Sequence, residues 1–94
     1  MLKFDHFNFN VLDLERSLEF YSKALELKPV RTKEAQDGSF RLVFLGDGET
    51  NFRLELTWMR DRTEPYDLGE QEFDLGFCTE GYGELVERHG AMGC

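Results

Sequence analysis

The spacing of hydrophobic residues changes at Asp13, and this change limits the possible folds more than any other feature of the chain. Over residues 3–11 (KFDHFNFNV) apolar and polar side chains alternate, which predicts a strand with one oily and one unusually polar face. Beyond Asp13, apolar residues recur at helical spacing, at Leu14, Leu18, Tyr21 and Leu25. Because Asp is a good N-cap and Pro29 cannot continue a helix, we expect a helix that ends near Lys28.

Three extended segments follow this helix and are separated by two DG turns, which are strong hairpin signals. The predicted strands cover residues 30–35, 40–45 and 51–58, and the turns are at Asp37-Gly38 and Asp47-Gly48. The last strand contains FRLELTW, whose apolar residues alternate with Arg53, Glu55 and Thr57. The order strand, helix, strand, strand, strand predicts an α+β module in which the helix covers the oily sheet face.

The rest of the chain predicts a linker and a second strand and helix. Residues 59–71 (MRDRTEPYDLGEQ) are charged and lack periodicity, as is typical of a linker. Residues 72–79 (EFDLGFCT) alternate again and predict a fifth strand, and a helical spacing follows at Tyr82, Leu85, Val86 and His89. With His6 laid over Asp74, this pair repeats the first strand and helix. We therefore expect a single domain with a complete βαβββ module at 1–58, a linker at 59–71 and a truncated second module at 72–94.

Size and charge limit the partners. A chain of 94 residues has room for one small domain with a thin core. A net charge of −8 argues against binding to nucleic acid or to an anionic membrane surface, and no apolar run approaches the roughly 20 residues of a membrane span. The N-terminus lacks a signal-peptide core, and the two cysteines, Cys78 and Cys94, show no metal-ligand spacing. We expect a cytoplasmic protein with reduced thiols whose partners are small molecules or proteins.

The strand faces that point away from the helices collect polar side chains. These are His6, Asn8 and Asn10 on the first strand, Arg53, Glu55 and Thr57 on the fourth, and Asp74 and Cys78 on the fifth. Each alone is ordinarily a solvated or hydrogen-bonded strand residue. An imidazole and two carboxylates on one surface also match the ligand preference of Zn²⁺, Ni²⁺, Mn²⁺ or Fe²⁺. Spacing alone leaves a metal site and an ordinary polar face both open.

Three stretches resemble glyoxalase I and other members of the vicinal oxygen chelate (glyoxalase/bleomycin resistance/dioxygenase) superfamily. DHFNFNVLDLERSLEFYSKALEL is similar to the opening strand and helix of these proteins, FRLELT to the strand that carries a glutamate ligand, and YDLGEQEFDLGF to the approach to the second module. The resemblance implies that His6 and Glu55 are metal ligands. It places Asp74 where the second module usually opens with a histidine. The fourth family ligand, also implicated as the base, would lie beyond Cys94, which leaves Glu55 as the candidate catalytic base.

The resemblance also implies a cofactor and a substrate. Ni²⁺ or Zn²⁺ is the expected ion, with Mn²⁺, Co²⁺ and Fe²⁺ as alternatives, and Asn8, Asn10 and Thr57 are the expected substrate contacts. Asn10 stands where glyoxalase I often has an arginine that meets glutathione. The implied activity is of lactoylglutathione lyase type: isomerisation of the hemithioacetal of a 2-oxoaldehyde and a thiol such as glutathione, through a metal-stabilised enediolate, as in methylglyoxal detoxification.

Two other functions stay open at this point. One is a non-catalytic small-molecule-binding protein of the same fold, of the antibiotic-sequestering type, and the other is an inactive truncated member of the family. The expected assembly is a homodimer or a domain-exchanged oligomer, because an isolated fifth strand and helix leave an exposed edge.

Overall fold

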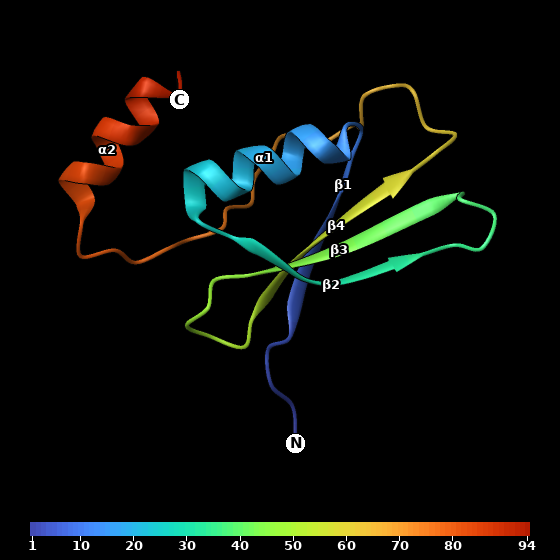
Figure 1. Ribbon diagram of the computed structural model, residues 1–94, viewed down its shortest axis with the longest axis horizontal. Helices are drawn as coiled ribbons and strands as arrows, with labels where there is room; N and C mark the ends of the chain where they lie inside the picture. The colour runs from blue at the N-terminus through green and yellow to red at the C-terminus, as the bar shows by residue number, and fades with distance from the viewer.

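The computed structural model in Figure 1 describes all residues 1–94. Its elements are β1 (His6–Val11), α1 (Leu14–Leu25), β2 (Lys28–Glu34), β3 (Phe40–Gly46), β4 (Arg53–Met59) and α2 (Tyr82–Ala91). The first five elements have the predicted βαβββ order, and the α+β fold class is confirmed. None of the helices is long and apolar enough to cross a membrane.

The four strands form one sheet in the order β1-β4-β3-β2, with β1 parallel to β4 and the other pairs antiparallel. Both DG turns form as predicted, because Gly38 and Gly48 have φ of 75° and 78°, a conformation that glycine adopts at little cost. The preceding aspartates stabilise the turns: Asp37 accepts a hydrogen bond from the Ser39 amide at 3.0 Å, and Asp47 accepts one from the Thr50 amide at 2.8 Å. The antiparallel strands β2, β3 and β4 are therefore held in register.

Helix α1 covers one face of the sheet and forms the core with it (Figure 1). Asp13 caps its first turn by accepting a hydrogen bond from the Arg16 amide at 3.0 Å. The helix ends at Leu25, earlier than predicted, because Glu26 takes a left-handed conformation with φ of 57° and β2 begins at Lys28. The core is thin, as expected, with eight of 94 residues buried; its main cluster is Leu14, Leu27, Val43, Leu45, Leu54 and Leu56.

The opposite face of the sheet points away from α1 and is here called the open face. It carries the polar side chains of β1 and β4 and the two apolar side chains of β3 that alternate with the core residues Val43 and Leu45. Its members on these three strands are His6, Asn8, Asn10, Leu42, Phe44, Arg53, Glu55 and Thr57.

The fifth strand predicted over residues 72–79 does not form. The backbone of this segment makes no hydrogen bond to the sheet. Instead the segment runs past the side of the sheet that α1 covers (orange in Figure 1), where the ring of Phe73 lies 6.1 Å from that of Phe7. A β-strand forms only where its backbone is hydrogen-bonded to a neighbouring strand, so the alternation of apolar and polar residues in this segment does not by itself make it a strand. The division of the chain into a complete and a partial module stays a prediction.

The predicted second helix forms as α2, and it is attached by polar contacts at the C-terminal end of α1. The imidazole Nε2 of His89 lies 2.6 Å from the carbonyl oxygen of Ala24, and Arg88 donates to the same oxygen at 3.3 Å. Arg88 also lies 3.4 Å from the carboxylate of Glu26. The last carbonyls of α1 thereby gain partners. None of the residues of α2 is buried.

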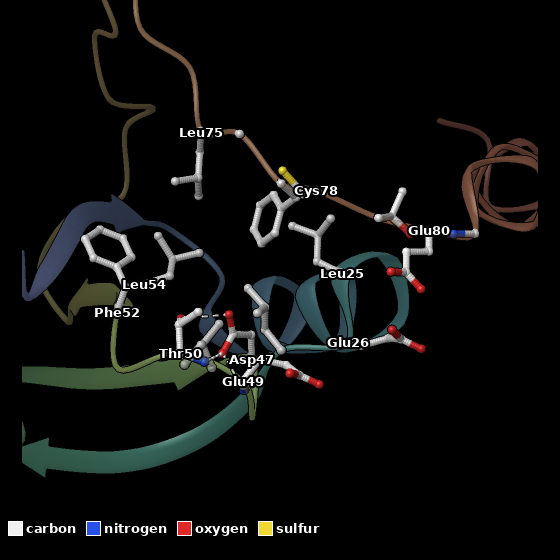
Figure 2. A pocket seen from close by; sticks show the side chains of 16 residues that line it. Leu25, Glu26, Asp47, Glu49, Thr50, Phe52, Leu54, Leu75, Cys78 and Glu80 are labelled. Carbon is white, nitrogen blue, oxygen red and sulfur yellow. Dashed lines mark hydrogen bonds between the residues drawn. The ribbon is translucent and has the colours of Figure 1, made fainter.

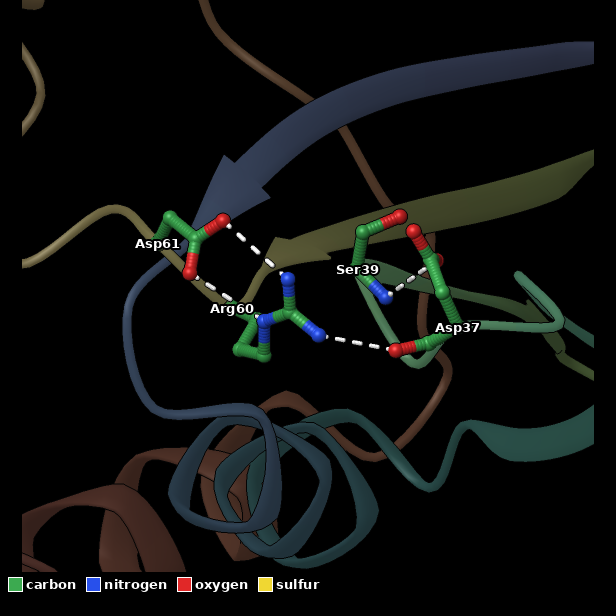
Figure 3. Close-up of polar contacts among 4 residues, drawn as sticks. All are labelled: Asp37, Ser39, Arg60 and Asp61. Carbon is green, nitrogen blue, oxygen red and sulfur yellow. Dashed lines mark hydrogen bonds and ion pairs between the residues drawn. The ribbon is translucent and has the colours of Figure 1, made fainter.

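Arg60 ties the end of β4 to the turn between β2 and β3 (Figure 3). Its guanidinium donates to the carbonyl oxygen of Asp37 at 2.8 Å, and it pairs with both carboxylate oxygens of Asp61, at 3.1 and 3.3 Å. Its amide also donates to the carbonyl of Ser39 at 3.0 Å. This end of the sheet is therefore fixed by side chains as well as by the ladder.

Candidate metal centre

His6 and Glu55 meet on the open face because β1 and β4 are neighbours in the sheet. The register pairs Asn8 with Glu55, so His6 is one alternation away on the same face. His6 Nε2 lies 3.5 Å from Glu55 Oε1. The His6 side chain is 41% exposed and that of Glu55 is 12% exposed, so the pair is reachable from solvent while the carboxylate is held in place.

Asp5 orients the His6 ring from the other side. The Asp5 carboxylate lies 2.6 Å from His6 Nδ1, which leaves Nε2 directed at Glu55. This hydrogen bond raises the pKa of His6 above its usual value of 6.5; burial opposes the shift, and the charges of Glu55 and Asp5 add to it. The same hydrogen bond lowers the pKa of Asp5. Metal-binding histidines usually hold their second nitrogen in this way.

Asn8 holds the carboxylate of Glu55, and Thr57 in turn contacts Asn8. One terminal atom of the Asn8 amide lies 2.7 Å from Thr57 Oγ1 and 3.1 Å from both the carboxylate Oε1 and the carbonyl oxygen of Glu55. Because the two Glu55 oxygens can only accept, this atom is the amide nitrogen, and it acts as the donor. One of the predicted substrate contacts, Asn8, therefore also positions Glu55, and a second, Thr57, supports Asn8. Asn10 is exposed on the same face and forms no side-chain hydrogen bond within the chain.

The structure does not bring Asp74 to His6 and Glu55. No group of three or more His, Cys, Asp or Glu side chains is arranged to hold an ion. The reason is the path of residues 72–79, which follow the α1 side of the sheet and place Phe73 on Phe7. The imidazole and carboxylate present nevertheless fit a divalent ion in their chemistry, their separation and the support of Nδ1, and they supply two donors.

Sequence reasoning missed Asp5 and Phe44. Strand alternation assigns Asp5 to the opposite face from His6, but β1 begins only at His6, so Asp5 is free to turn toward the ring. Phe44 meets the imidazole edge to face, with ring centroids 5.6 Å apart. Its place beside Glu55 in the sheet register is the signal that could have revealed it, once the strand order is known.

A hollow of about 930 Å³ lies elsewhere, between residues 75–81 and the ends of α1 and the β3–β4 loop (Figure 2). Leu25, Phe52, Leu54 and Leu75 line its apolar part, with acidic side chains around them. Leu54 is a core residue on the α1 side of the sheet, so this hollow is separate from the His6–Glu55 pair on the open face.

Comparison with known proteins identifies the class. The sequence profile of the Glyoxalase/Bleomycin resistance protein/Dioxygenase superfamily matches residues 3–92, and the chain belongs to this superfamily. Within it, the chain is 47% identical over 85 residues to a lactoylglutathione lyase of Neisseria meningitidis serogroup A, covering 88% of this chain and 61% of the relative.

Two more distant relatives agree. A lactoylglutathione lyase of Arabidopsis thaliana is 31% identical over 93 residues, which are 97% of this chain and 32% of the relative. The solved structure of the trypanothione-dependent glyoxalase I of Leishmania major is 28% identical and superposes with a TM-score of 0.85 over 99% of this chain and 68% of that one. The chain thus spans about three fifths of the length of the Neisseria relative.

Proposed function

We propose that this protein is a glyoxalase I-like isomerase of the lactoylglutathione lyase type, which acts on the hemithioacetal of a 2-oxoaldehyde and a thiol. The observation that carries the proposal is the His6–Glu55 pair on the open face, 3.5 Å apart, with Asp5 behind the imidazole and Asn8 beside the carboxylate. The 47% identity to a lactoylglutathione lyase supports the choice of reaction.

His6 Nε2 and the Glu55 carboxylate would hold a divalent ion, with Ni²⁺ or Zn²⁺ as the proposed species. Such an ion acts as a Lewis acid on the neighbouring oxygens of the substrate and lowers the barrier by several kcal/mol. The hydrogen bond from Nδ1 to Asp5 fixes the ring so that its other nitrogen keeps the lone pair a ligand needs. Further donors have to come from residues outside this pair.

Glu55 is the proposed base. Its carboxylate takes the proton from the carbon that carries sulfur and returns it to the adjacent former carbonyl carbon, while a hydroxyl proton passes between the two oxygens. The product is a 2-hydroxy thioester with the same atoms as the substrate. Asn8, itself in contact with Thr57, keeps the carboxylate in place, and Asn8, Asn10 and Thr57 are proposed to contact the substrate.

A second copy of the chain is the proposed partner. The free edge of β1 and the segment 72–80, whose backbone forms no hydrogen bond to the sheet, are the features that support pairing or exchange between copies. Light scattering tests this, and a well-folded monomer at high concentration contradicts it. A cytoplasmic location is proposed with the function, supported by the free thiols of Cys78 and Cys94.

The test is an assay with methylglyoxal and glutathione, with and without added Ni²⁺ or Zn²⁺, beside a measurement of bound metal. We expect metal-dependent turnover that is lost in Glu55→Gln and His6→Ala and kept in Glu87→Gln, an exposed carboxylate of α2. A rate no higher than that of the metal alone would refute the proposal. Absence of any metal affinity, together with binding of small apolar molecules, would favour the binding-protein alternative.

A further inference from the structure

The hollow of about 930 Å³ on the α1 side of the sheet takes no part in the proposed reaction, because the His6–Glu55 pair lies on the open face. Its floor is formed by three buried core side chains, those of Leu27, Leu45 and Leu54. Its outer wall is the segment 75–81, which passes over this floor on the way to α2 (Figure 2). The volume is in the range of small-molecule sites, which is about 300–1,000 Å³.

The outer wall presents apolar side chains that nothing in the chain covers. Phe77 is 49% exposed and Leu75 is 39% exposed, although both line the hollow beside the buried leucines of its floor. Phe52, at the end of the β3–β4 loop, adds a half-buried ring. No backbone hydrogen bond joins this wall to the sheet. An apolar group that enters the hollow therefore takes surface of Leu75 and Phe77 out of water, which favours binding in proportion to the area covered.

Carboxylates surround this apolar interior, and no cation lines the hollow with them. The charged lining residues are all acidic: Glu26, Asp47, Glu49 and Glu80. Three of the four form no ion pair in the chain, and only Glu26 has a basic partner, Arg88 at 3.4 Å. Asp47 is held in place by the amides of Thr50 and Glu49, which donate to it at 2.8 and 2.9 Å, and the bond from Thr50 is the main cause of its lowered pKa. The rim thus carries negative charge that the chain does not neutralise.

The carboxylates are spread around the hollow and do not gather at one point. Lys28 of β2 is paired with Gly46 of β3. Glu26 precedes this pair and Asp47 follows it, so both stand at one end of the sheet, whereas Glu80 belongs to the outer wall (Figure 2). No group of three or more His, Cys, Asp or Glu side chains is arranged to hold a metal ion, which needs several donors at about 2.0–2.6 Å. A dispersed acidic rim suits an organic cation better.

We propose that the hollow binds a small amphipathic cation: an apolar chain or ring that ends in an ammonium group. The apolar part lies against Leu54, Leu75 and Phe77, and the ammonium group stands at the rim near the exposed carboxylates of Glu49 and Glu80. The same carboxylates reject an anionic amphiphile of equal size, such as a fatty acid. The site needs neither the metal nor the open face, so it is independent of the proposed function.

The experiment compares three probes that separate the charge from the apolar tail. Octyltrimethylammonium has both, octanoate has the tail with the opposite charge, and tetramethylammonium has the charge without the tail. Each is titrated into the full chain below the concentration at which it forms micelles, at low and constant ionic strength, and the backbone amides are followed by NMR. We expect saturable shifts at Thr50, Leu75 and Glu80 with the first probe, and at least about 10-fold weaker binding of the other two.

A pair of matched variants tests the charge. Glu49→Gln/Glu80→Gln should bind octyltrimethylammonium about 3- to 10-fold more weakly than the wild type. Glu64→Gln/Glu87→Gln removes the same net charge from exposed positions outside the hollow and should bind it as the wild type does.

A second pair tests the tail. Phe77→Ala should weaken the binding of octyltrimethylammonium about 5-fold, whereas Leu68→Ala, which truncates an exposed apolar side chain outside the hollow, should leave it unchanged. All of the substituted side chains are exposed, so the variants should keep the urea unfolding midpoint of the wild type.

Three results would overturn the inference. Equal affinity for octanoate would show that the carboxylates do not select the charge of the ligand. An equal loss in the two double variants would show that the probe follows the overall charge of −8 and not the rim of the hollow. Unaltered binding in Phe77→Ala, or an absence of shifts at the lining residues, would show that the tail lies elsewhere. Turnover and metal binding are not measured, so failure of the proposed function leaves this test unaffected.

Discussion

Mutations of the adjacent β4 residues Leu56 and Glu55 are predicted to differ in their cost to folding stability. Leu56 belongs to the core, whereas Glu55 belongs to the candidate metal centre. Leu56 is completely buried and is paired with Phe9 and Val43 in the middle of the core. Truncation to alanine removes about 2–2.5 kcal/mol of transfer free energy, and the cavity left behind brings the cost to about 3–4 kcal/mol. Glu55→Gln keeps shape and hydrogen bonds on the open face and should cost less than about 1 kcal/mol.

The size of the first effect matters because the core is thin. A domain of this length is stable by about 5–14 kcal/mol, so Leu56→Ala would remove about a fifth or more of the total. In urea, with a slope of about 1.5 kcal/mol per molar, the midpoint should fall by about 2–3 M while the slope stays unchanged. Unfolding is followed by circular dichroism at several protein concentrations, so that any contribution from association is separated from the effect of the mutation.

The reasoning is refuted if Leu56→Ala lowers stability by less than about 1 kcal/mol, or if Glu55→Gln costs as much as Leu56→Ala. Either result would mean that the two faces of β4 have been assigned wrongly, and the candidate metal centre would lose its structural basis.

Three further predictions follow from local contacts. In the metal-free protein, His6 should titrate above pH 6.5 by NMR. Its contact with Asp5 therefore stabilises the fold fully below pH 6.5, and less as the pH rises through the higher native pKa. Asp5→Asn should lower the titration midpoint of His6, and an unchanged midpoint contradicts the contact. Gly46→Ala would place a Cβ 3.0 Å from Cγ1 of Val30 and should lower the free energy of unfolding in urea by about 1–3 kcal/mol. Gly76→Ala, whose Cβ would have nothing within 4 Å, should be near neutral, and equal effects of the two substitutions count against the close approach at Gly46. Asp13→Ala removes the N-cap of α1 and should cost about 1 kcal/mol in the same assay, and an unaltered midpoint would exclude a capping role.

The fold of the first module could be predicted because its local signals agree with its tertiary packing. Asp13 begins the helix, the two DG turns fix the hairpins, and the alternation in FRLELTW buries Leu54 and Leu56 while leaving Glu55 on the open face. Each of these features depends on the nearest few residues or on one strong periodicity.

The segment 72–79 shows where this reasoning fails. Its alternation is as regular as that of β1, but a strand needs a neighbour with free hydrogen-bonding groups on the correct side, and periodicity does not show whether one is available. The ring of Phe73 packs against that of Phe7, and the backbone of the segment does not join the sheet.

For the candidate site, the pair of His6 and Glu55 could be foreseen from strand faces and family resemblance, whereas its support could not. Asp5 reaches His6 because it lies just outside β1, where the alternation rule no longer applies. Phe44 lies beside Glu55 and against His6 only through the register of β3 and β4, and that register depends on turn geometry.

The most direct test of the central claim is a Zn²⁺ titration that observes the ring nitrogens of both histidines by NMR. The protein has two histidines, and His89, bonded to the end of α1, is an internal control for non-specific binding. We predict that one equivalent of Zn²⁺ shifts the Nε2 resonance of His6 and leaves His89 in place, and that the shift disappears in Glu55→Gln. A His6 Nε2 resonance that does not shift on addition of Zn²⁺, or that shifts equally in Glu55→Gln, would contradict the shared metal centre.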